Sequence, residues 1–382
     1  MQHKLTPAFK SNNIPVLFST DNKYVPYFSV AVKSLIENTT EDNNYDIIIL
    51  SQDLSELSKK KLSSLKNEKN NVSIRFYDMH EYIENSRRQF FLNSYLPIET
   101  YYKFFLPDLM GNYDKCLYLD GDIAILDDVA ELYHINIGSH PLGASLNVAN
   151  INSNNTNPDE KIIGDYTRKE YFSGLLKMKN PDKYFQAGVL ICNLKKMREI
   201  GYTEACLKKF DEIKTPRFFD QCVLNSLYSE NYHCFSTEWN HVWYIQNPQS
   251  LKGGISEKLY KEFLLGRENP KIVHFASPYK PYHKPEWDLS EYFWKYARLT
   301  PYYEEILYKN MQKNNQAPAK SEIDLVMLKD CLNIQKLKKR YQRYRLLSNL
   351  TFGKIRKKYN DLRKIYKSKL KNIKAFLKNK NK

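Results

Sequence analysis

Residues 115–133 read KCLYLDGDIAILDDVAELY, and this stretch places two carboxylates inside an apolar run. Asp120 and Asp122 follow the strand-like segment 116–119 and precede a second apolar segment. Ionised carboxylates are costly to bury unless they are paired or bind a metal. The pair therefore lies at the solvent-facing end of a strand or serves a cation.

Strand and helix patterns alternate through the first third of the chain. Short apolar runs predict strands at 14–19, 45–50, 72–77 and 116–119, and helical spacing predicts helices at 25–37, 54–65 and 100–109. Such alternation indicates an α/β fold with a mainly parallel sheet, whose ligand sites lie beyond the carboxyl ends of the strands. Asp21 and the Asp pair both fall at such ends, which explains how the sequence tolerates them.

The remainder of the chain has fewer regular patterns. Residues 188–191 and 271–275 predict strands, and the polar, Asn-rich residues 147–157 predict a loop. Residues 290–312 predict an aromatic-rich helical region, and residues 314–320 have the composition of a linker.

The formal net charge of +16 is concentrated at one end of the 382 residues. Residues 336–382 contain 19 Lys and Arg and one acid, Asp361, which leaves the other 335 residues at a net charge of −2. A near-neutral body argues against nucleic-acid binding. No apolar run approaches the ~20 residues that span a bilayer, and the six cysteines form no Cys-x-x-Cys pair, so we expect reduced thiols and a cytoplasmic protein.

Four interpretations compete for Asp120-Gly121-Asp122. A strand-end turn is the simplest, because Asp-Gly is a common turn pair. A calcium loop is excluded, because Ala124 and Ile125 occupy a ligand and the glycine position. A haloacid-dehalogenase-like phosphatase needs a later acidic pair, for which Asp165 and Glu170 are the candidates. The fourth is an Asp-x-Asp motif that holds Mg²⁺ or Mn²⁺ on the diphosphate of a nucleotide sugar.

The segment VHFASPYKPYH, residues 273–283, offers a third metal ligand. His274 ends an apolar strand, and an imidazole beside two carboxylates shifts the preference from Mg²⁺ toward Mn²⁺. Lys280 follows in a loop stiffened by prolines, where its ammonium can neutralise phosphate. A histidine at a strand end is more often an ordinary hydrogen-bonded residue, and this is the interpretation we keep for His283.

Four segments, taken in order, resemble one known family. They are LYLDGDIAI, YFQAGVLICNLKKMRE, FFDQCVLN and VHFASPYKPYH, which begin at residues 117, 184, 218 and 273. From about residue 14 to about residue 287 the chain resembles the retaining glycosyltransferases of family 8, the bacterial lipopolysaccharide galactosyl- and glucosyltransferases. The resemblance implies the GT-A fold, in which a Rossmann-like nucleotide-binding half is fused to an acceptor-binding half.

The resemblance also implies roles for individual residues. Asp120, Asp122 and His274 would bind the metal, Mn²⁺ or Mg²⁺. A UDP-sugar donor would contact Asp21, Tyr24, Lys103, Asp120, Gly121, Asn147, Gln186, Ser277 and Lys280. Asp21 would hydrogen-bond the base and Tyr24 would stack on it, although helix packing is the alternative for Tyr24.

The chain departs from the family pattern at several of these positions. Lys103 stands where arginine is usual, so it neutralises charge without a planar bidentate contact. Ser277 replaces a glycine, Gln186 an asparagine and Tyr282 a tryptophan. For Asn147, a sugar contact and a simple loop cap are both open.

Asp220 and Gln221 are the pair that the resemblance places beside the reacting carbon. The Asp can hold sugar hydroxyls, and the neutral Gln oxygen can stabilise oxocarbenium-like charge without a covalent bond. The family motif continues with a second Asp, which here is Cys222. The alternative for the pair is a helix-start Asp with a buried Gln.

Apolar residues recur every three or four positions along the basic tail, which is typical of an interfacial membrane helix. They are Ile355, Tyr359, Leu362, Tyr366, Leu370, Ile373 and Leu377. Self-repulsion disfavours a coiled coil. We therefore expect the tail to bind an anionic membrane surface.

The sequence thus predicts a GT-A catalytic domain at 1–290, a helical extension and linker at 291–335, and a basic membrane-association tail at 336–382. We expect a metal-dependent retaining hexosyltransferase, peripherally attached to the inner face of the cytoplasmic membrane. It would move glucose or galactose from a UDP-sugar to a glycolipid, such as lipopolysaccharide core, or to another oligosaccharide. The alternatives are the phosphatase and a non-enzymatic polybasic membrane-binding adaptor.

Overall fold

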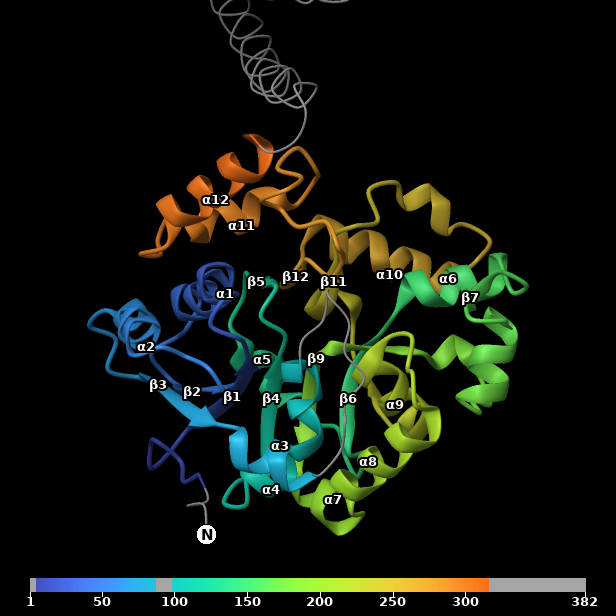
Figure 1. The fold of residues 1–382 in the computed structure, drawn as a ribbon, viewed down its shortest axis with the longest axis horizontal. Helices are drawn as coiled ribbons and strands as arrows, with labels where there is room; N and C mark the ends of the chain where they lie inside the picture. Colours follow the sequence, from blue (N-terminus) through green and yellow to red (C-terminus); the bar gives the residue numbers. More distant parts are fainter. Residues whose placement is uncertain (1–4, 87–97, 316–382) are drawn as a thin grey trace, which may run out of the picture. The chain divides into compact units, whose positions relative to one another are not determined.

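The computed structural model describes residues 5–86 and 98–315 (Figure 1). The chain divides into two units, residues 1–306 and 307–382, and the sheets and the candidate site lie in the first. None of the helices in the described ranges is both long and apolar enough to cross a bilayer. The predicted membrane-association tail, residues 336–382, lies outside the described residues.

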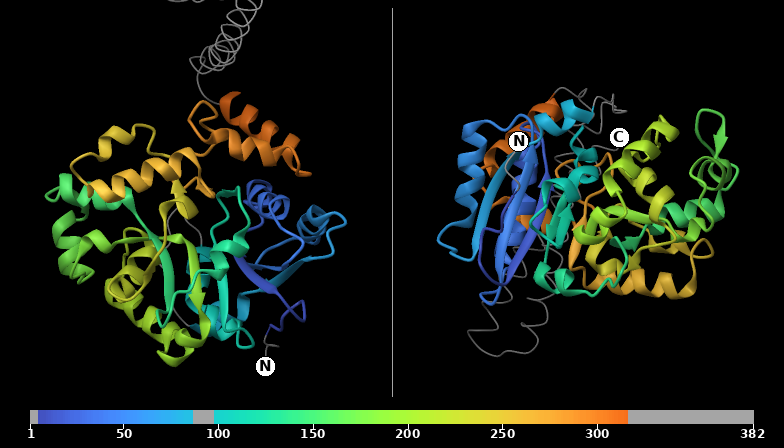
Figure 2. Two further views of the ribbon diagram at one scale, coloured as in Figure 1. Left: turned by 180° about the vertical axis from the view of Figure 1, so that it is seen from behind. Right: turned by 90° about the horizontal axis from the view of Figure 1, so that it is seen from below.

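A seven-stranded sheet organises the first unit, in the order β10-β6-β9-β4-β1-β2-β3. Its strands are β1 (Asn13–Ser19), β2 (Asn44–Ser51), β3 (Val72–Asp78), β4 (Lys115–Leu119), β6 (Leu142–Leu146), β9 (Phe185–Asn193) and β10 (His233–Cys234). Only β9 runs antiparallel to its neighbours β4 and β6. Figure 2 shows the same strands from behind and from below. The predicted α/β fold with a mainly parallel sheet is confirmed.

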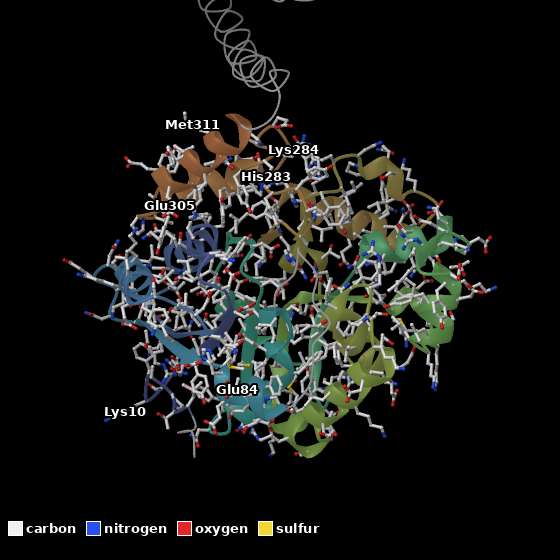
Figure 3. All side chains as sticks on the ribbon, in the orientation of Figure 1. Lys10, Glu84, His283, Lys284, Glu305 and Met311 are labelled. Carbon is white, nitrogen blue, oxygen red and sulfur yellow. The ribbon has the colours of Figure 1, made fainter. Side chains whose placement is uncertain are left out.

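The sheet separates two hydrophobic cores, because successive side chains of a strand point to opposite faces. Val16 and Phe18 of β1 pack with α1 (Val25–Glu37) and α11 (Ser290–Ala297). Leu17 points to the other face. There the cover consists of η2 (Ile98–Phe105), α4 (Leu106–Leu109), α7 (Leu194–Glu199), α8 (Tyr202–Ile213), α9 (Phe219–Tyr228) and α10 (Glu257–Glu268). Side chains fill the space between the sheet and its helices (Figure 3).

A second, small sheet positions the site, in the order β11-β12-β5. Its strands are β11 (His241–Val242), β12 (Ile272–His274) and β5 (Ile123–Ile125). Because β12 pairs antiparallel with β5, His274 lies opposite Ile123, the residue after Asp122. The late strand is thereby brought to the Asp pair.

The other helices and strands are shorter or peripheral. They are α2 (Glu56–Ser63), η1 (Ser64–Lys66), α3 (His80–Ser86), α5 (Val129–His134), α6 (Val148–Thr156), β7 (Lys161–Ile163), β8 (Tyr166–Thr167), η3 (Glu170–Leu175), η4 (Pro181–Lys183), η5 (Thr237–Asn240), η6 (Pro248–Leu251) and α12 (Tyr303–Asn315). The predicted helix at 54–65 is therefore α2 followed by η1, and the predicted region 290–312 is divided between α11 and α12.

One predicted element is wrong: most of the predicted loop at 147–157 is helix α6, Val148–Thr156. Asn147 caps the helix, because its side chain accepts a hydrogen bond from the backbone N–H of Asn150 at 3.0 Å. Val148 and Ile151, three residues apart, are buried in the core. Capping and burial on one face outweigh the poor helix propensity of the asparagines that follow.

Candidate active site

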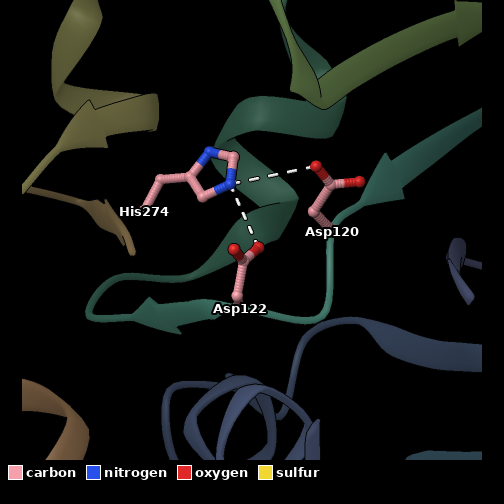
Figure 4. A group of neighbouring side chains, drawn as sticks. All are labelled: Asp120, Asp122 and His274. Atoms are coloured by element: carbon pink, nitrogen blue, oxygen red, sulfur yellow. Dashed lines mark hydrogen bonds and ion pairs between the residues drawn. The ribbon is translucent and has the colours of Figure 1, made fainter. Parts of the chain in front are cut away.

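Asp120 and Asp122 lie where the chain passes from β4 of the main sheet to β5 of the small sheet. The Nε2 atom of His274 lies 3.1 Å from Asp122 Oδ1 and 3.8 Å from Asp120 Oδ2 (Figure 4). Three side chains from two distant parts of the sequence therefore meet at one point, as the predicted metal site requires.

The three side chains fit a divalent metal. One ligand atom from each of them lies within 4.8 Å of the others, and ligand atoms bound at ~2.1 Å to an octahedral ion are separated by ~3 to ~4.2 Å. His274 Nδ1 lies 2.8 Å from the side-chain oxygen of Asn240. Donation of the Nδ1–H to this oxygen leaves the Nε2 lone pair facing the carboxylates.

The backbone of β9 passes close to this group at Gly188. A Cβ atom at this position would lie 2.2 Å from His274 Cε1 and 2.6 Å from Asp120 Oδ2. The carbonyl of Gly188 also accepts a hydrogen bond from the Asp120 backbone N–H at 2.7 Å. Only glycine fits here. Its role is not evident from the sequence, where Gly188 is simply the first residue of a predicted strand.

Lys280 provides positive charge beside Asp122. Its Nζ atom lies 2.6 Å from Asp122 Oδ2 and donates to the Phe275 carbonyl at 2.9 Å. Burial opposes ionisation of Asp122, but Lys280 and His274 outweigh it and hold the pKa of this carboxyl well below its usual range. Burial raises the pKa of Asp120, despite the nearby Lys103 and His274. The two carboxylates of the motif therefore occupy different electrostatic environments.

Lys103 joins the Asp pair to the predicted catalytic pair. Its ammonium, only 1% exposed, lies 2.7 Å from Asp220 Oδ2 and 3.4 Å from Asp120 Oδ1. Burial opposes the charged form, but Asp120 and Asp220 outweigh it and raise the pKa of Lys103. Thr100 donates to the other oxygen of Asp220 at 2.5 Å. One buried cation thus holds the two acidic groups together.

The amide of Gln221 is held at both ends. Its Oε1 accepts from the Ala187 backbone N–H at 3.1 Å, and its Nε2 donates to the Tyr184 hydroxyl at 3.1 Å. The thiol of Cys222, at the position of the family's second Asp, is buried and accepts from the Phe218 N–H at 3.2 Å. The amide orientation of Gln221 is therefore fixed before any substrate binds.

Several residues predicted to bind the donor line one small pocket. They are Tyr24, Gly121 and Lys280, and the lining also includes the predicted metal ligand Asp122 and the rings of Tyr27 and Tyr282. Asp21 accepts a hydrogen bond from the Tyr24 backbone N–H at 2.6 Å, so it lies at the same place. Ser277 is in the loop that leads to Lys280, and its hydroxyl donates to the Tyr279 carbonyl at 2.6 Å.

Asn147 and Gln186 are buried and have partners within the protein. Asn147 caps α6, as described above. Gln186 accepts a hydrogen bond from Asn240 Nδ2 at 3.1 Å, and Asn240 in turn orients His274. Their predicted contacts with a sugar stay predictions. Asn240 itself carried no signal in the sequence, because it belongs to none of the four family segments.

Comparisons with known proteins agree with this geometry. The model of the family described as Glycosyl transferase family 8 matches residues 15–286. The chain is 23% identical over 285 residues to general stress protein A of Bacillus subtilis, a match that covers 72% of this chain and 88% of that protein. It is 23% identical over 335 residues to the lipopolysaccharide 1,2-glucosyltransferase of Escherichia coli K12, covering 87% and 85% of the two chains.

Solved structures show the same fold. The bifunctional glycosyltransferase WbbM aligns with a TM-score of 0.70 and 27% identity, over 80% of this chain and 53% of WbbM, so the chain spans about half of that protein. The galactosyltransferase LgtC, solved with donor and acceptor sugar analogues, aligns with a TM-score of 0.61 and 23% identity, over 75% of this chain and 96% of LgtC. The predicted GT-A fold is confirmed.

Proposed function

Because the chain belongs to glycosyltransferase family 8 and is a hexosyltransferase, we propose that it transfers glucose or galactose from a UDP-sugar to a glycolipid or other glycan acceptor. The reaction retains the anomeric configuration and uses a divalent metal, Mn²⁺ or Mg²⁺. The lipopolysaccharide glucosyltransferase among the relatives supports a lipopolysaccharide-core acceptor.

One observation carries this proposal: a three-ligand metal site and a fixed Gln221 belong to one hydrogen-bonded cluster. Lys103 connects Asp120 to Asp220, the neighbour of Gln221, through contacts of 3.4 and 2.7 Å. Such a cluster can hold the diphosphate and the sugar of one donor molecule at the same time. Neither a structural turn nor a surface adaptor requires this arrangement.

The metal ligands, Lys280 and Asp220 have different roles in the transfer. A metal held by Asp120, Asp122 and His274 would neutralise charge on the diphosphate. Lys280, on the loop beside Asp122, pairs with the departing phosphate oxygens. Asp220 accepts hydrogen bonds from sugar hydroxyls.

Gln221 acts where positive charge develops in the transition state. One lone pair of its Oε1 accepts from Ala187, and the second lone pair of an amide oxygen remains for the anomeric carbon. Because the amide is neutral and already held in place, it stabilises this charge without reorganisation.

The phosphatase alternative has no support in the geometry. Its second acidic pair, Asp165 and Glu170, belongs to the β7–β8 region. The Asp165 side chain is fully exposed and pairs with Lys161, and Glu170 accepts from Thr167. Neither carboxylate joins the group around Asp120.

We further propose that residues 336–382 attach the enzyme to an anionic membrane. The support is the sequence pattern alone, namely 19 basic residues against one acid with apolar residues at helical spacing. Each basic residue near an anionic leaflet contributes ~1 kcal/mol, so a fraction of them is enough for docking.

The proposed reaction is tested by incubating the full chain and Mn²⁺ with a panel of radiolabelled nucleotide sugars. We expect slow release of free hexose from one UDP-sugar, and loss of this release in Asp122→Asn. Asp127→Asn is the matched control, because Asp127 pairs with Lys271 away from the cluster. Equal hydrolysis with and without metal would contradict the metal role, and an aspartyl-phosphate on Asp120 would favour the phosphatase.

A further inference from the structure

A polar groove of about 400 Å³ lies beside α6, away from the residues assigned above. It is formed by α6, the segment after the β7–β8 hairpin, η3 and η4. Its polar lining includes Asn154, Asn155, Arg168, Asn180 and Asp182. Its volume falls in the range of ~300–1,000 Å³ that is common for small-molecule sites.

Part of the groove wall is rigidly held. Asn155 Nδ2 donates to Asp182 Oδ1 and to the Gly254 carbonyl, both at 2.9 Å. Arg168 Nε donates to Glu160 Oε2 at 2.7 Å. These contacts tie α6 to η4 and to the loop before α10, so the wall is in place before a ligand arrives.

The same wall contains polar atoms without partners. Both amide atoms of Asn154 and the Nη1 atom of Arg168 are buried and make no hydrogen bond with any described residue. Leaving one such atom unsatisfied costs about 1–3 kcal/mol. These atoms have almost no exposed surface, so a ligand in the groove reaches them only when the Asn154 side chain turns toward it. The wall therefore has unused hydrogen-bonding capacity.

Both long walls of the groove connect along the chain to residues that are predicted to contact the donor sugar. Asn154 lies seven residues after Asn147, or ~10 Å along a helix. The backbone N–H of Asn147 donates to the carbonyl of Tyr184, the residue before β9, at 2.9 Å. Asp182 lies four residues before Gln186 of β9, at most ~14 Å of chain. A short oligosaccharide with one end at the cluster can reach the groove with the other.

The charges in the groove favour an uncharged ligand. The guanidinium of Arg168 is matched by Glu160, and the Asp182 carboxylate is engaged by Asn155. An amide offers a donor and an acceptor side by side, which suits neighbouring sugar hydroxyls. Lys169 also lines the groove, and among the described residues no ion pair is found for it, but one exposed lysine is weak support for phosphate or a nucleotide.

We propose that this groove is a second acceptor subsite, which binds sugar units of the acceptor glycan remote from the hydroxyl that is glycosylated. The inference rests on the proposed glycosyl transfer and adds to it the length of the acceptor: the enzyme recognises an oligosaccharide and not only its terminal sugar. Asn154, Asn180 and Arg168 supply the hydrogen bonds.

The test compares acceptors of different length with the full chain. The short acceptors are methyl α-glucoside and methyl β-galactoside, and the long ones are maltotetraose, lacto-N-neotetraose and a core oligosaccharide released from lipopolysaccharide. For Asn154→Ala we expect the KM of a long acceptor to rise ~10-fold, with kcat, the KM of the short acceptors and donor hydrolysis unchanged. Asn157→Ala is the matched control, because Asn157 is exposed and its side-chain amide donates to the adjacent Thr156 hydroxyl.

Different results would contradict the proposed function and the acceptor subsite. Loss of donor hydrolysis in the parent chain would count against the proposed function. Equal KM values for long acceptors in Asn154→Ala and the parent would overturn the subsite. Saturation-transfer NMR with the same oligosaccharides requires no turnover. Signal that weakens in Asn154→Ala supports the subsite, and no signal from any oligosaccharide in the parent also overturns it.

Discussion

Buried Lys103 shows how single residues connect the parts of this site. Family 8 usually has arginine at this position, and lysine gives up the planar bidentate contact. Here the ammonium instead makes separate contacts to Asp220, Asp120 and the Ala187 carbonyl. Lysine keeps the charge compensation, because this depends on the distance between the charged groups. It loses the bidentate geometry, because this requires a planar guanidinium.

Gly188→Ala should disable the metal site. The added Cβ would lie 2.2 Å from His274 Cε1 and 2.6 Å from Asp120 Oδ2, so His274 and Asp120 must move apart. We expect the Kd for Mn²⁺, measured by calorimetry, to rise at least ~10-fold. Gly174→Ala is the control, since a Cβ there meets no atom within 4 Å. An unchanged Kd in Gly188→Ala would mean that the ion binds elsewhere.

Gln221→Ala should lower kcat far more than it changes donor affinity. The amide is held by Ala187 and Tyr184 at the place where charge develops only in the transition state. Loss of one such group costs roughly 100-fold in kcat, while we expect the donor Kd to stay within about twofold. Cys222→Ser keeps a hydrogen-bonding atom in the adjacent position and should retain most activity. Parental kcat in Gln221→Ala would remove the residue from the mechanism.

Glu99→Gln should stabilise the protein at high pH and leave it unchanged at low pH. Burial, with the nearby carboxylates of Asp21 and Asp53, raises the pKa of Glu99 from 4.5 to about 7. Folding therefore favours the neutral acid. The stability that this provides is complete below pH ~4.5 and is lost as pH rises through about 7.

The glutamine mimics the neutral acid at every pH. Urea unfolding should show the Glu99→Gln variant more stable than the parent by about 3 kcal/mol at pH 8, and equal to it near pH 4.5. Glu56→Gln, at an 88% exposed side chain, should give no comparable pH-dependent difference. A constant difference across pH would show that shape and not charge is responsible.

At the scale of secondary-structure elements, sequence patterns predicted the buried strands well and α6 badly. Strands β1, β2 and β4 are nearly continuous apolar runs, because both faces of the sheet are covered there, and such runs are easily recognised. In α6 the asparagines obscure the helical spacing of apolar residues, and only Val148 and Ile151 indicate the face that packs against the core. The order of the strands and the pairing of β12 with β5 depend on contacts between distant segments, which no local pattern contains.

The residues of the site likewise divide into those that the sequence predicts and those that it does not. The motif segments correctly predicted that Asp120, Asp122 and His274 lie close together, because each lies next to the end of an apolar strand. Thr100, Asn240 and Tyr184 went unnoticed, since they act only through hydrogen bonds to residues distant in sequence. Supporting residues of this kind become visible only in three dimensions.

Asn147→Ala should separate helix capping from sugar contact. Loss of the cap on α6 should cost about 1 kcal/mol of stability. Asn193→Ala is the matched control, because Asn193 caps α7 through the Lys196 N–H at 3.0 Å and should cost a similar amount. If Asn147 also contacts the sugar, kcat/KM for the donor falls in Asn147→Ala only. Equal kcat/KM in the two variants would restrict Asn147 to its structural role.

At the scale of the whole molecule, charge is divided between a near-neutral catalytic part and a strongly basic end. The family match ends at residue 286, and the 19 basic residues begin 50 residues later. The proposed placement on a membrane surface can therefore be tested separately from catalysis by truncation. A local excess of acceptor raises the rate without any contact between the tail and the reacting groups.

Deletion of residues 336–382 should leave donor hydrolysis intact and lower transfer to acceptor embedded in anionic vesicles. The metal and donor residues all precede the deletion, so hydrolysis has no reason to change. Binding of the full chain should weaken with salt, because the Debye length falls from ~10 Å at 0.1 M to ~3 Å at 1 M. Release should be partial, since burial of the apolar positions persists. Equal sedimentation of full-length and truncated protein with anionic vesicles would defeat the proposal, as would equal sedimentation of the full chain with neutral and anionic vesicles at low salt.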